Sequence, residues 1–124
     1  MSSNSGFEQS SYAGQVVVVT GAASGIGKSA AQLIASRGAK VICLDLNQAS
    51  VDQTVAEIKA TGATAESAVL DISNQAGVMD LIATVAKKHS KIDALVNCAG
   101  YPGPTGKFVE DIAWNDYQKV IEVN

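Results

Sequence analysis

Three closely spaced glycines are the residues in this sequence with the clearest chemical meaning. The stretch TGAASGIG, Thr20–Gly27, places glycines at positions 21, 25 and 27. Gly21 allows a tight turn, Gly25 lets backbone approach a diphosphate without an obstructing Cβ, and Gly27 lets a following helix pack closely on a sheet. Free N–H groups in the first turn of that helix would point at the phosphates, aided by the helix dipole. Glycines also mark plain turns, so the phosphate interpretation requires a strand before the stretch and a helix after it.

An acidic residue downstream completes the same chemistry. Asp45 ends the next apolar run, and its carboxylate could accept hydrogen bonds from both hydroxyls of an adenine ribose while repelling a 2′-phosphate. No Arg or Lys lies between Gly21 and Gly27, or just after Asp45, to offset that repulsion. The sequence therefore predicts NAD(H) as the preferred cofactor rather than NADP(H). The alternative is that Asp45 only caps a turn with Asn47.

Alternating strand and helix patterns supply the required context. Short apolar runs occur at 15–20, 40–45, 66–71 and 93–97, and three of the four lack polar alternation, as strands buried on both faces do. Amphipathic patterns between them predict helices at 25–37, 48–60 and 74–88, with Ser73 as the N-cap of the third. This β-α-β-α-β-α-β order predicts an α/β fold with right-handed crossovers and a parallel sheet. A Gly- and Pro-rich loop and a last helical pattern containing Trp114, Tyr117 and Ile121 follow.

Composition limits the class of protein. The chain has 124 residues, 47% of them hydrophobic and 17% charged, which is typical of one globular domain. A net charge of −3 argues against a nucleic-acid or anionic-membrane partner. No apolar run approaches the roughly 18 residues that a membrane span requires. His89 lies near a predicted helix C-terminus, where a cation suits the dipole, and is not expected to be catalytic.

The N-terminal segment and the cysteines suggest a location. Residues 1–14 are Ser-rich and lack the basic and apolar regions of a signal peptide, so we expect a flexible tail. Cys43 and Cys98 form no CxxC motif, and with a single histidine no zinc site of ordinary spacing is expected. Two reduced, mostly buried thiols are typical of a cytoplasmic protein.

Taken in order, these motifs resemble those of the short-chain dehydrogenase/reductase family, specifically its classical type. The matching segments are TGAASGIG, Asp45 at the end of the second strand, LDIS at 70–73, NCAG at 97–100 and VN at 123–124. Cys98 departs from the pattern, which more often has Asn there. The resemblance implies a Rossmann-type sheet over residues 15–124, present as an incomplete doubly wound fold.

The resemblance also implies roles for individual residues in cofactor binding. Ser24 and Ile26 would contact the pyrophosphate, and Asp45 would bind the adenosine ribose. Asp71 would accept a hydrogen bond from the adenine amino group, with the Ile72 N–H beside it. As an alternative, Asp71 could be a helix-cap or turn residue.

Three further positions would lie on the nicotinamide side. The resemblance places Asn97, Ala99 and Gly100 along the nicotinamide ribose, where they would also brace the sheet. Asn97 could instead be mostly structural.

Only one member of the family's Asn-Ser-Tyr-Lys tetrad has a counterpart in this chain. Asn124 resembles the asparagine that holds a water in the proton relay. In the family, a lysine four residues after the catalytic tyrosine lowers the tyrosine pKa, but Tyr12, Tyr101 and Tyr117 are each followed at that spacing by another residue type.

We therefore expect the N-terminal part of a longer oxidoreductase that exchanges hydride between NAD(H) and a small secondary alcohol or ketone. The parent enzyme is expected to be a homo-oligomer. Two alternatives stay open: a non-catalytic half-domain that binds a dinucleotide or dimerises, and a product without function that folds poorly. The open edge of a fourth strand favours some instability.

Overall fold

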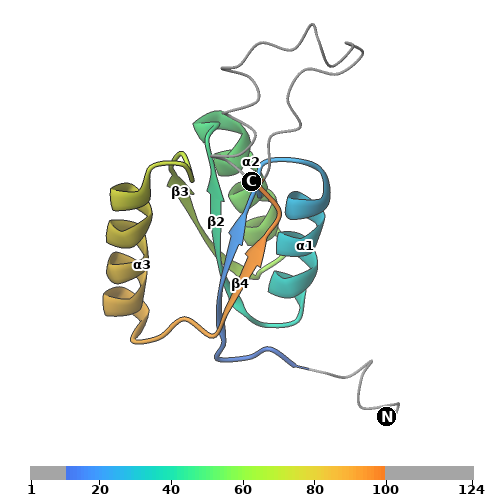
Figure 1. Ribbon diagram of the computed structural model, residues 1–124. Helices are drawn as coiled ribbons and strands as arrows, with labels where there is room; N and C mark the ends of the chain where they lie inside the picture. Colours follow the sequence, from blue (N-terminus) through green and yellow to red (C-terminus); the bar gives the residue numbers. More distant parts are fainter. Residues whose placement is uncertain (1–10, 100–124) are drawn as a thin grey trace, which may run out of the picture.

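Four parallel strands form the centre of the molecule. The computed structural model describes residues 11–99 and shows a sheet with the strand order β3-β2-β1-β4 (Figure 1). This order and the parallel pairing confirm the α/β fold predicted from the sequence. The predicted last helical pattern and the Gly- and Pro-rich loop lie outside the described residues, apart from Cys98 and Ala99. In chain order the elements are β1 (Val16–Thr20), α1 (Gly25–Ser36), β2 (Lys40–Asp45), α2 (Gln48–Ala60), β3 (Thr64–Val69), α3 (Gln75–His89) and β4 (Ala94–Asn97).

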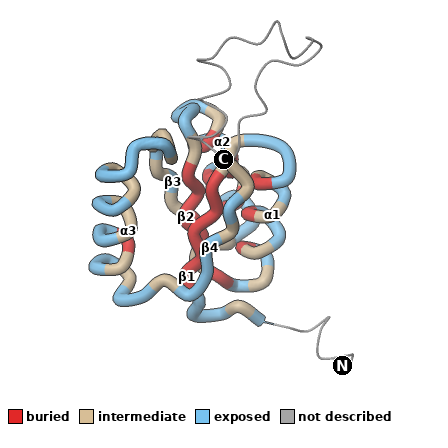
Figure 2. The backbone as a smooth tube through the Cα atoms, in the orientation of Figure 1, coloured by how far each residue is buried: buried red, intermediate tan, exposed pale blue. Residues whose placement is uncertain are grey.

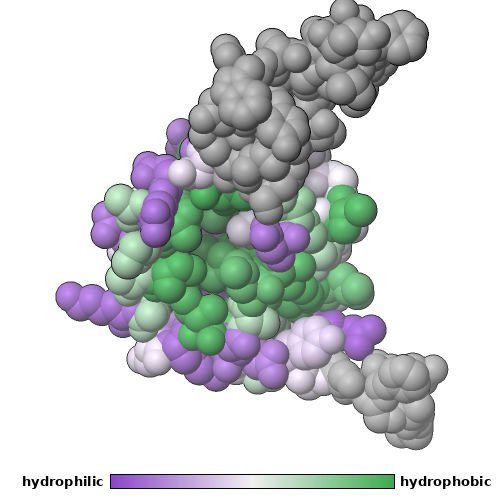
Figure 3. Space-filling view, in the orientation of Figure 1, coloured by the Kyte–Doolittle hydropathy of each residue, from purple (hydrophilic) through white to green (hydrophobic). Residues whose placement is uncertain are grey.

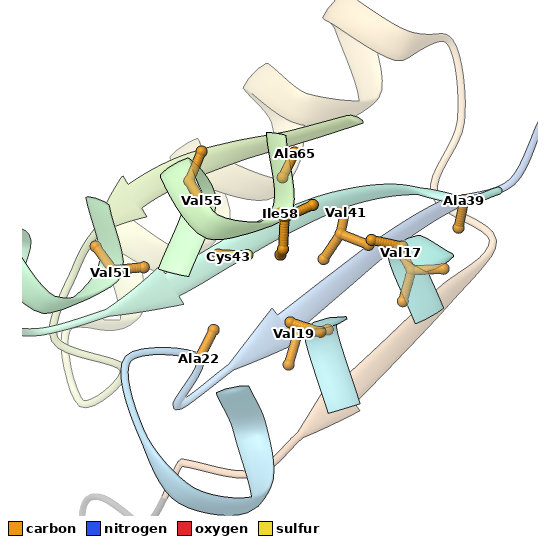
Figure 4. Packing of buried hydrophobic residues seen from close by; sticks show 12 residues of the cluster. Val17, Val19, Ala22, Ala39, Val41, Cys43, Val51, Val55, Ile58 and Ala65 are labelled. Carbon is orange, nitrogen blue, oxygen red and sulfur yellow. The ribbon is translucent and has the colours of Figure 1, made fainter. Parts of the chain in front are cut away.

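Helices cover the two faces of the sheet unequally. Helices α1 and α2 lie on one face and α3 lies on the other (Figure 1). The α1/α2 side holds the larger core, in which side chains such as Val19, Val41 and Ile58 pack together (Figure 4). On the α3 side a smaller cluster joins Ile42 of β2 to Val85 of α3. Ala22 of the glycine loop belongs to this larger core.

Burial is concentrated in the two inner strands. All five residues of β1 are buried, as are the four central residues of β2 (Figure 2). Within residues 11–99, strand β4 pairs only with β1, and its Leu95 is 58% exposed. Apolar surface gathers on this side of the molecule (Figure 3). The prediction of burial on both faces thus holds for β1 and β2 but is wrong for β4, because β4 ends the described strand order.

Most element boundaries lie within one residue of the predicted ones, and two local features, the start of β3 and the N-cap of α3, differ for an identifiable reason. Strand β3 runs two residues earlier than expected, because its register with β2 pairs Thr64 with Lys40 and Val69 with Asp45. The N-cap of α3 is Asn74, whose side-chain oxygen accepts a hydrogen bond from Gly77 N at 3.0 Å. Ser73 does not cap the helix, because its hydroxyl donates to Asp71.

The end of the polar N-terminal segment is attached to the fold. Tyr12 N donates to Arg37 O at 2.8 Å, and the Tyr12 side chain packs against the α1/α2 core. Residues 1–10 of the predicted tail lie outside the described part of the chain.

Both cysteines are free thiols. Burial raises the pKa of Cys43 to about 11, whereas Cys98 is partly exposed. Among residues 11–99 no helix combines the length and apolar character needed to cross a bilayer.

Candidate functional site

A cleft of about 400 Å³ lies at the carboxyl ends of the strands. The glycine loop, the ends of β2 and β3 and the segment after β4 all contribute to it, although they are far apart in the sequence. In parallel α/β sheets this edge is where ligands bind. The lining residues are Gly21, Ser24, Ile26, Gly27, Leu44, Asp45, Leu46, Leu70, Asp71, Ile72, Cys98 and Ala99.

Each of the three glycines is required for a different geometric reason. Gly21 has a φ of +68°, and a Cβ there would lie 2.9 Å from Ala99 N. A Cβ on Gly27 would overlap the carbonyl oxygen of Gly21 and would lie 3.1 Å from Thr20 O at the end of β1, so this glycine lets α1 pack closely on the loop and on the end of the sheet. Gly25 has a φ of +60° with no atom within 4 Å of its would-be Cβ. Protein atoms therefore leave no room for a side chain at Gly21 and Gly27, whereas Gly25 faces open space.

The first turn of α1 offers unpaired donors to this cleft. Ser24 is the N-cap residue in an extended conformation, and its side chain makes no capping hydrogen bond. The first N–H groups of any helix lack intrahelical partners and carry the positive end of its dipole. No acidic residue lies in the first turn of α1 to compensate them. This turn can therefore bind an anionic group such as a diphosphate.

Asp45 joins the glycine loop to the end of β2. Its Oδ2 accepts a hydrogen bond from Ala23 N at 3.0 Å, and its Oδ1 accepts one from Asn47 N at 3.2 Å. A backbone hydrogen bond of 3.2 Å from Ala22 N to Leu44 O attaches the loop at a second point. The predicted turn contact with Asn47 is thus present, and the same carboxylate also lines the cleft.

Asp71 also combines a turn contact with a position in the cleft. Its Oδ1 accepts hydrogen bonds from the backbone N of Ser73 at 2.9 Å and from the Ser73 hydroxyl at 2.7 Å. These contacts fit the alternative in which Asp71 is a turn residue. Asp71 and Ile72 nevertheless both line the cleft, at the end opposite the segment after β4.

A buried threonine connects the glycine loop to the end of β4. Thr20 is 6% exposed, and its hydroxyl donates to Asn97 Oδ1 at 2.6 Å. The hydroxyl oxygen of Thr20 also accepts hydrogen bonds from Cys98 N at 3.0 Å and from Ala99 N at 3.1 Å. This junction fixes the segment after β4 beside Gly21. Sequence reasoning did not single out Thr20, although a polar residue at the end of a run of four valines was an available signal.

The cleft contains most of the residues predicted to bind the cofactor. Gly25 and Asn97 do not line it, and Gly100 and Asn124 lie outside the described residues. Four lining residues were not predicted: Leu44, Leu46, Leu70 and Cys98. Leu46 directly follows Asp45 in the sequence and is 61% exposed, and this adjacency to a predicted site residue was a usable signal.

Lys28, which follows Gly27 in the sequence, is already paired. Lys28 Nζ lies 2.9 Å from Glu57 Oε2, which links α1 to α2. Residues 11–99 contain no group of acidic, Cys and His side chains that could hold a metal ion. The polar side chains that line the cleft are those of Ser24, Cys98, Asp45 and Asp71.

Comparison with known proteins places this arrangement among oxidoreductases. Residues 15–124 match the family model described as short chain dehydrogenase. The chain is 34% identical over 119 residues to a 3beta-hydroxysteroid dehydrogenase from Mediterraneibacter gnavus, covering 96% of this chain and 43% of that protein. It is 38% identical over 113 residues to the 2,5-dichloro-2,5-cyclohexadiene-1,4-diol dehydrogenase LinX of Sphingobium indicum, covering 90% and 44%.

A solved structure agrees in fold. The citronellol catabolism dehydrogenase AtuB of Pseudomonas aeruginosa superposes with a TM-score of 0.83 at 28% identity, over 90% of this chain and 45% of that one. The chain thus spans less than half the length of these three proteins.

Proposed function

The chain belongs to the short chain dehydrogenase family, and from that premise we propose that it forms the dinucleotide-binding part of an NAD(H)-dependent oxidoreductase. The observation that carries the proposal is the single cleft in which the open first turn of α1, Asp45 and Asp71 meet. A diphosphate at the α1 N-terminus would leave the adenosine to extend across the ends of β2 and β3.

Asp45 is proposed to select NAD(H) over NADP(H). Its carboxylate lies in the cleft and could accept hydrogen bonds from the ribose hydroxyls, but it would repel a 2′-phosphate. Lys28 cannot readily offset that repulsion, because it forms an ion pair with Glu57. Binding the ribose would require Asp45 to share or exchange its hydrogen bond from Ala23 N.

The proposed reaction is hydride transfer between the cofactor and a secondary alcohol or ketone. NAD supplies the hydride-accepting ring when it is bound. Both curated relatives described above are named for the oxidation of hydroxyl-bearing rings, which supports this substrate class. In this chain Thr20 would position the segment after β4 beside the nicotinamide half of the cofactor, and Asn124 would hold a water of the proton relay.

We further propose that the 124-residue chain by itself does not catalyse hydride transfer. None of its tyrosines is followed four residues later by the lysine that would lower a phenol pKa for proton exchange. Cofactor binding by this chain is therefore the direct test of its role, and it also fits the second candidate, a half-domain that binds a dinucleotide without catalysis.

The test is titration of the chain with NAD and with NADP, in which calorimetry measures the affinity and thermal unfolding measures the melting temperature. NAD should bind more tightly than NADP and should raise the melting temperature by a small amount. Asp45→Ala should abolish the NAD response, while Asp52→Ala, which removes an exposed carboxylate on α2, should leave it unchanged. Tighter binding of NADP than of NAD by the unsubstituted chain would refute the role of Asp45.

A further inference from the structure

A second hollow lies at the amino ends of the strands, on the edge of the sheet opposite the glycine loop. Its volume is about 330 Å³. Its lining residues come from the starts of β1, β2 and β3, the end of α3 and the segment between α3 and β4. Its lining residues are Gly14, Gln15, Val16, Gly38, Lys40, Thr64, Lys88, His89 and Lys91. We propose that this hollow binds a small phosphate-class dianion, a function separate from the cofactor cleft.

The hollow concentrates positive charge in an acidic chain. Lys40, Lys88 and Lys91 are three of only nine Lys and Arg residues in a chain of net charge −3. Two of these lysines are paired: Lys88 Nζ lies 2.9 Å from Glu66 Oε2, and Lys91 Nζ lies 3.2 Å from Asp93 Oδ2. The three lysines line the hollow, whereas neither Glu66 nor Asp93 does.

Lys40 carries a charge that no described carboxylate neutralises. Its Nζ lies 3.4 Å from Nδ1 of His89. A hydrogen bond between these two atoms requires Nδ1 to accept, because an ammonium can only donate, and it therefore places the ring proton on Nε2. That nitrogen is 3.2 Å from Glu66 Oε2, and the His89 side chain is only 5% exposed. A buried imidazole therefore holds Lys40 at the hollow without supplying a counter-charge.

Further groups fit an oxyanion better than an apolar ligand. The exposed Thr64 hydroxyl has no hydrogen-bond partner within residues 11–99 and can donate. Lysine binds phosphate as a compact point charge with three donors. A dianion could draw on Lys40 directly and on the two paired lysines as secondary donors. The net positive charge is small, so binding should be weak and strongly reduced by salt.

The test is NMR of the ¹⁵N-labelled 124-residue chain during titration with inorganic phosphate at constant ionic strength. We expect saturable shifts of the amide signals of Gly14, Gly38 and Thr64. Amides of the glycine loop report separately on the cofactor cleft. Glycerol 1-phosphate in a parallel titration distinguishes a metabolite's phosphate monoester from free phosphate, and chloride is the control for ionic strength.

Lys40→Gln should weaken phosphate binding about fivefold, the effect of losing one ion pair near a protein surface. Lys87→Gln is the matched control, because Lys87 lies beside Lys88 in the last turn of α3 but does not line the hollow. Lys91→Gln is the second test variant if the first perturbs the fold, which the amide spectrum would show. Equal binding by the Lys40 and Lys87 variants, equal shifts with chloride, or shifts confined to residues 21–27 would each overturn the proposal.

Discussion

The two ends of the strands present opposite surfaces built by different means. At the carboxyl ends, glycine backbone, helix N–H groups and the carboxylates of Asp45 and Asp71 surround the cleft. At the amino ends, lysine side chains and a buried histidine surround the hollow. The first surface depends on close backbone approach and tolerates few substitutions, whereas the second depends on long side chains that can rearrange. Substitutions at the carboxyl ends should therefore have the larger effects on folding.

The largest effect is expected from Gly27→Ala. The added Cβ would overlap the Gly21 carbonyl oxygen, which is backbone and cannot rotate away. The loss of stability should exceed the roughly 1–3 kcal/mol typical of overpacked cores. Urea unfolding monitored by circular dichroism measures it.

Gly25→Ala is the control for Gly27→Ala, because its Cβ would enter open space and only the φ of +60° opposes it. It should cost about 1–2 kcal/mol. A Gly25 variant less stable than the Gly27 variant would show that the loop is limited by conformation rather than by space.

Thr20→Val should have the next largest effect. Valine keeps the shape but leaves Cys98 N and Ala99 N without the oxygen that they share. A loss of about 1–3 kcal/mol is expected from the unsatisfied donors, and it should be measured by urea unfolding. The segment after β4 should also exchange its amide protons faster.

Thr54→Val is the matched control, because the Thr54 hydroxyl is fully buried but donates only to Ser50 O within α2. Its effect should be small. Equal losses for the two variants would contradict the assignment of Thr20 as the junction between β1 and β4.

The smallest effect on stability is expected from changes to the carboxylates at the amino ends of the strands. The hydrogen bond from Val16 N lowers the pKa of Asp93, and Lys91 lowers it further. Burial alone would raise the pKa of Glu66, but Lys88 and His89 outweigh it and the pKa is lowered. A lowered folded-state pKa means that stability is fully present above the ordinary carboxyl value of about 4 and is lost as the pH falls through the folded value.

Melting temperatures measured from pH 6 to pH 3 should therefore fall, and Asp93→Asn should reduce that fall. Asparagine can still accept from Val16 N but has no charge to lose. Asp52→Asn, on the exposed surface of α2, should leave the acid dependence unchanged. If the Asp93→Asn variant kept the full acid dependence of the melting temperature, the Asp93 charge would contribute nothing to the stability of the fold.

Sequence reasoning was most successful where local pattern decides structure. The glycine spacing and the acid at the end of the second apolar run predicted residues that do meet in one cleft. It was less successful at strand ends: β3 begins earlier than predicted because pairing with β2, not composition, sets its register. The exposure of Leu95 likewise depends on the position of β4 in the strand order.

The alternation of strands and helices and the glycine loop between β1 and α1 follow from local sequence, because periodicity and glycine conformation act over a few neighbouring residues. The contacts of Thr20 with Asn97 and of Lys40 with His89, by contrast, depend on how the chain folds in three dimensions. Those partners are 77 and 49 positions apart, and their distance is set by strand order and register, which no local pattern encodes.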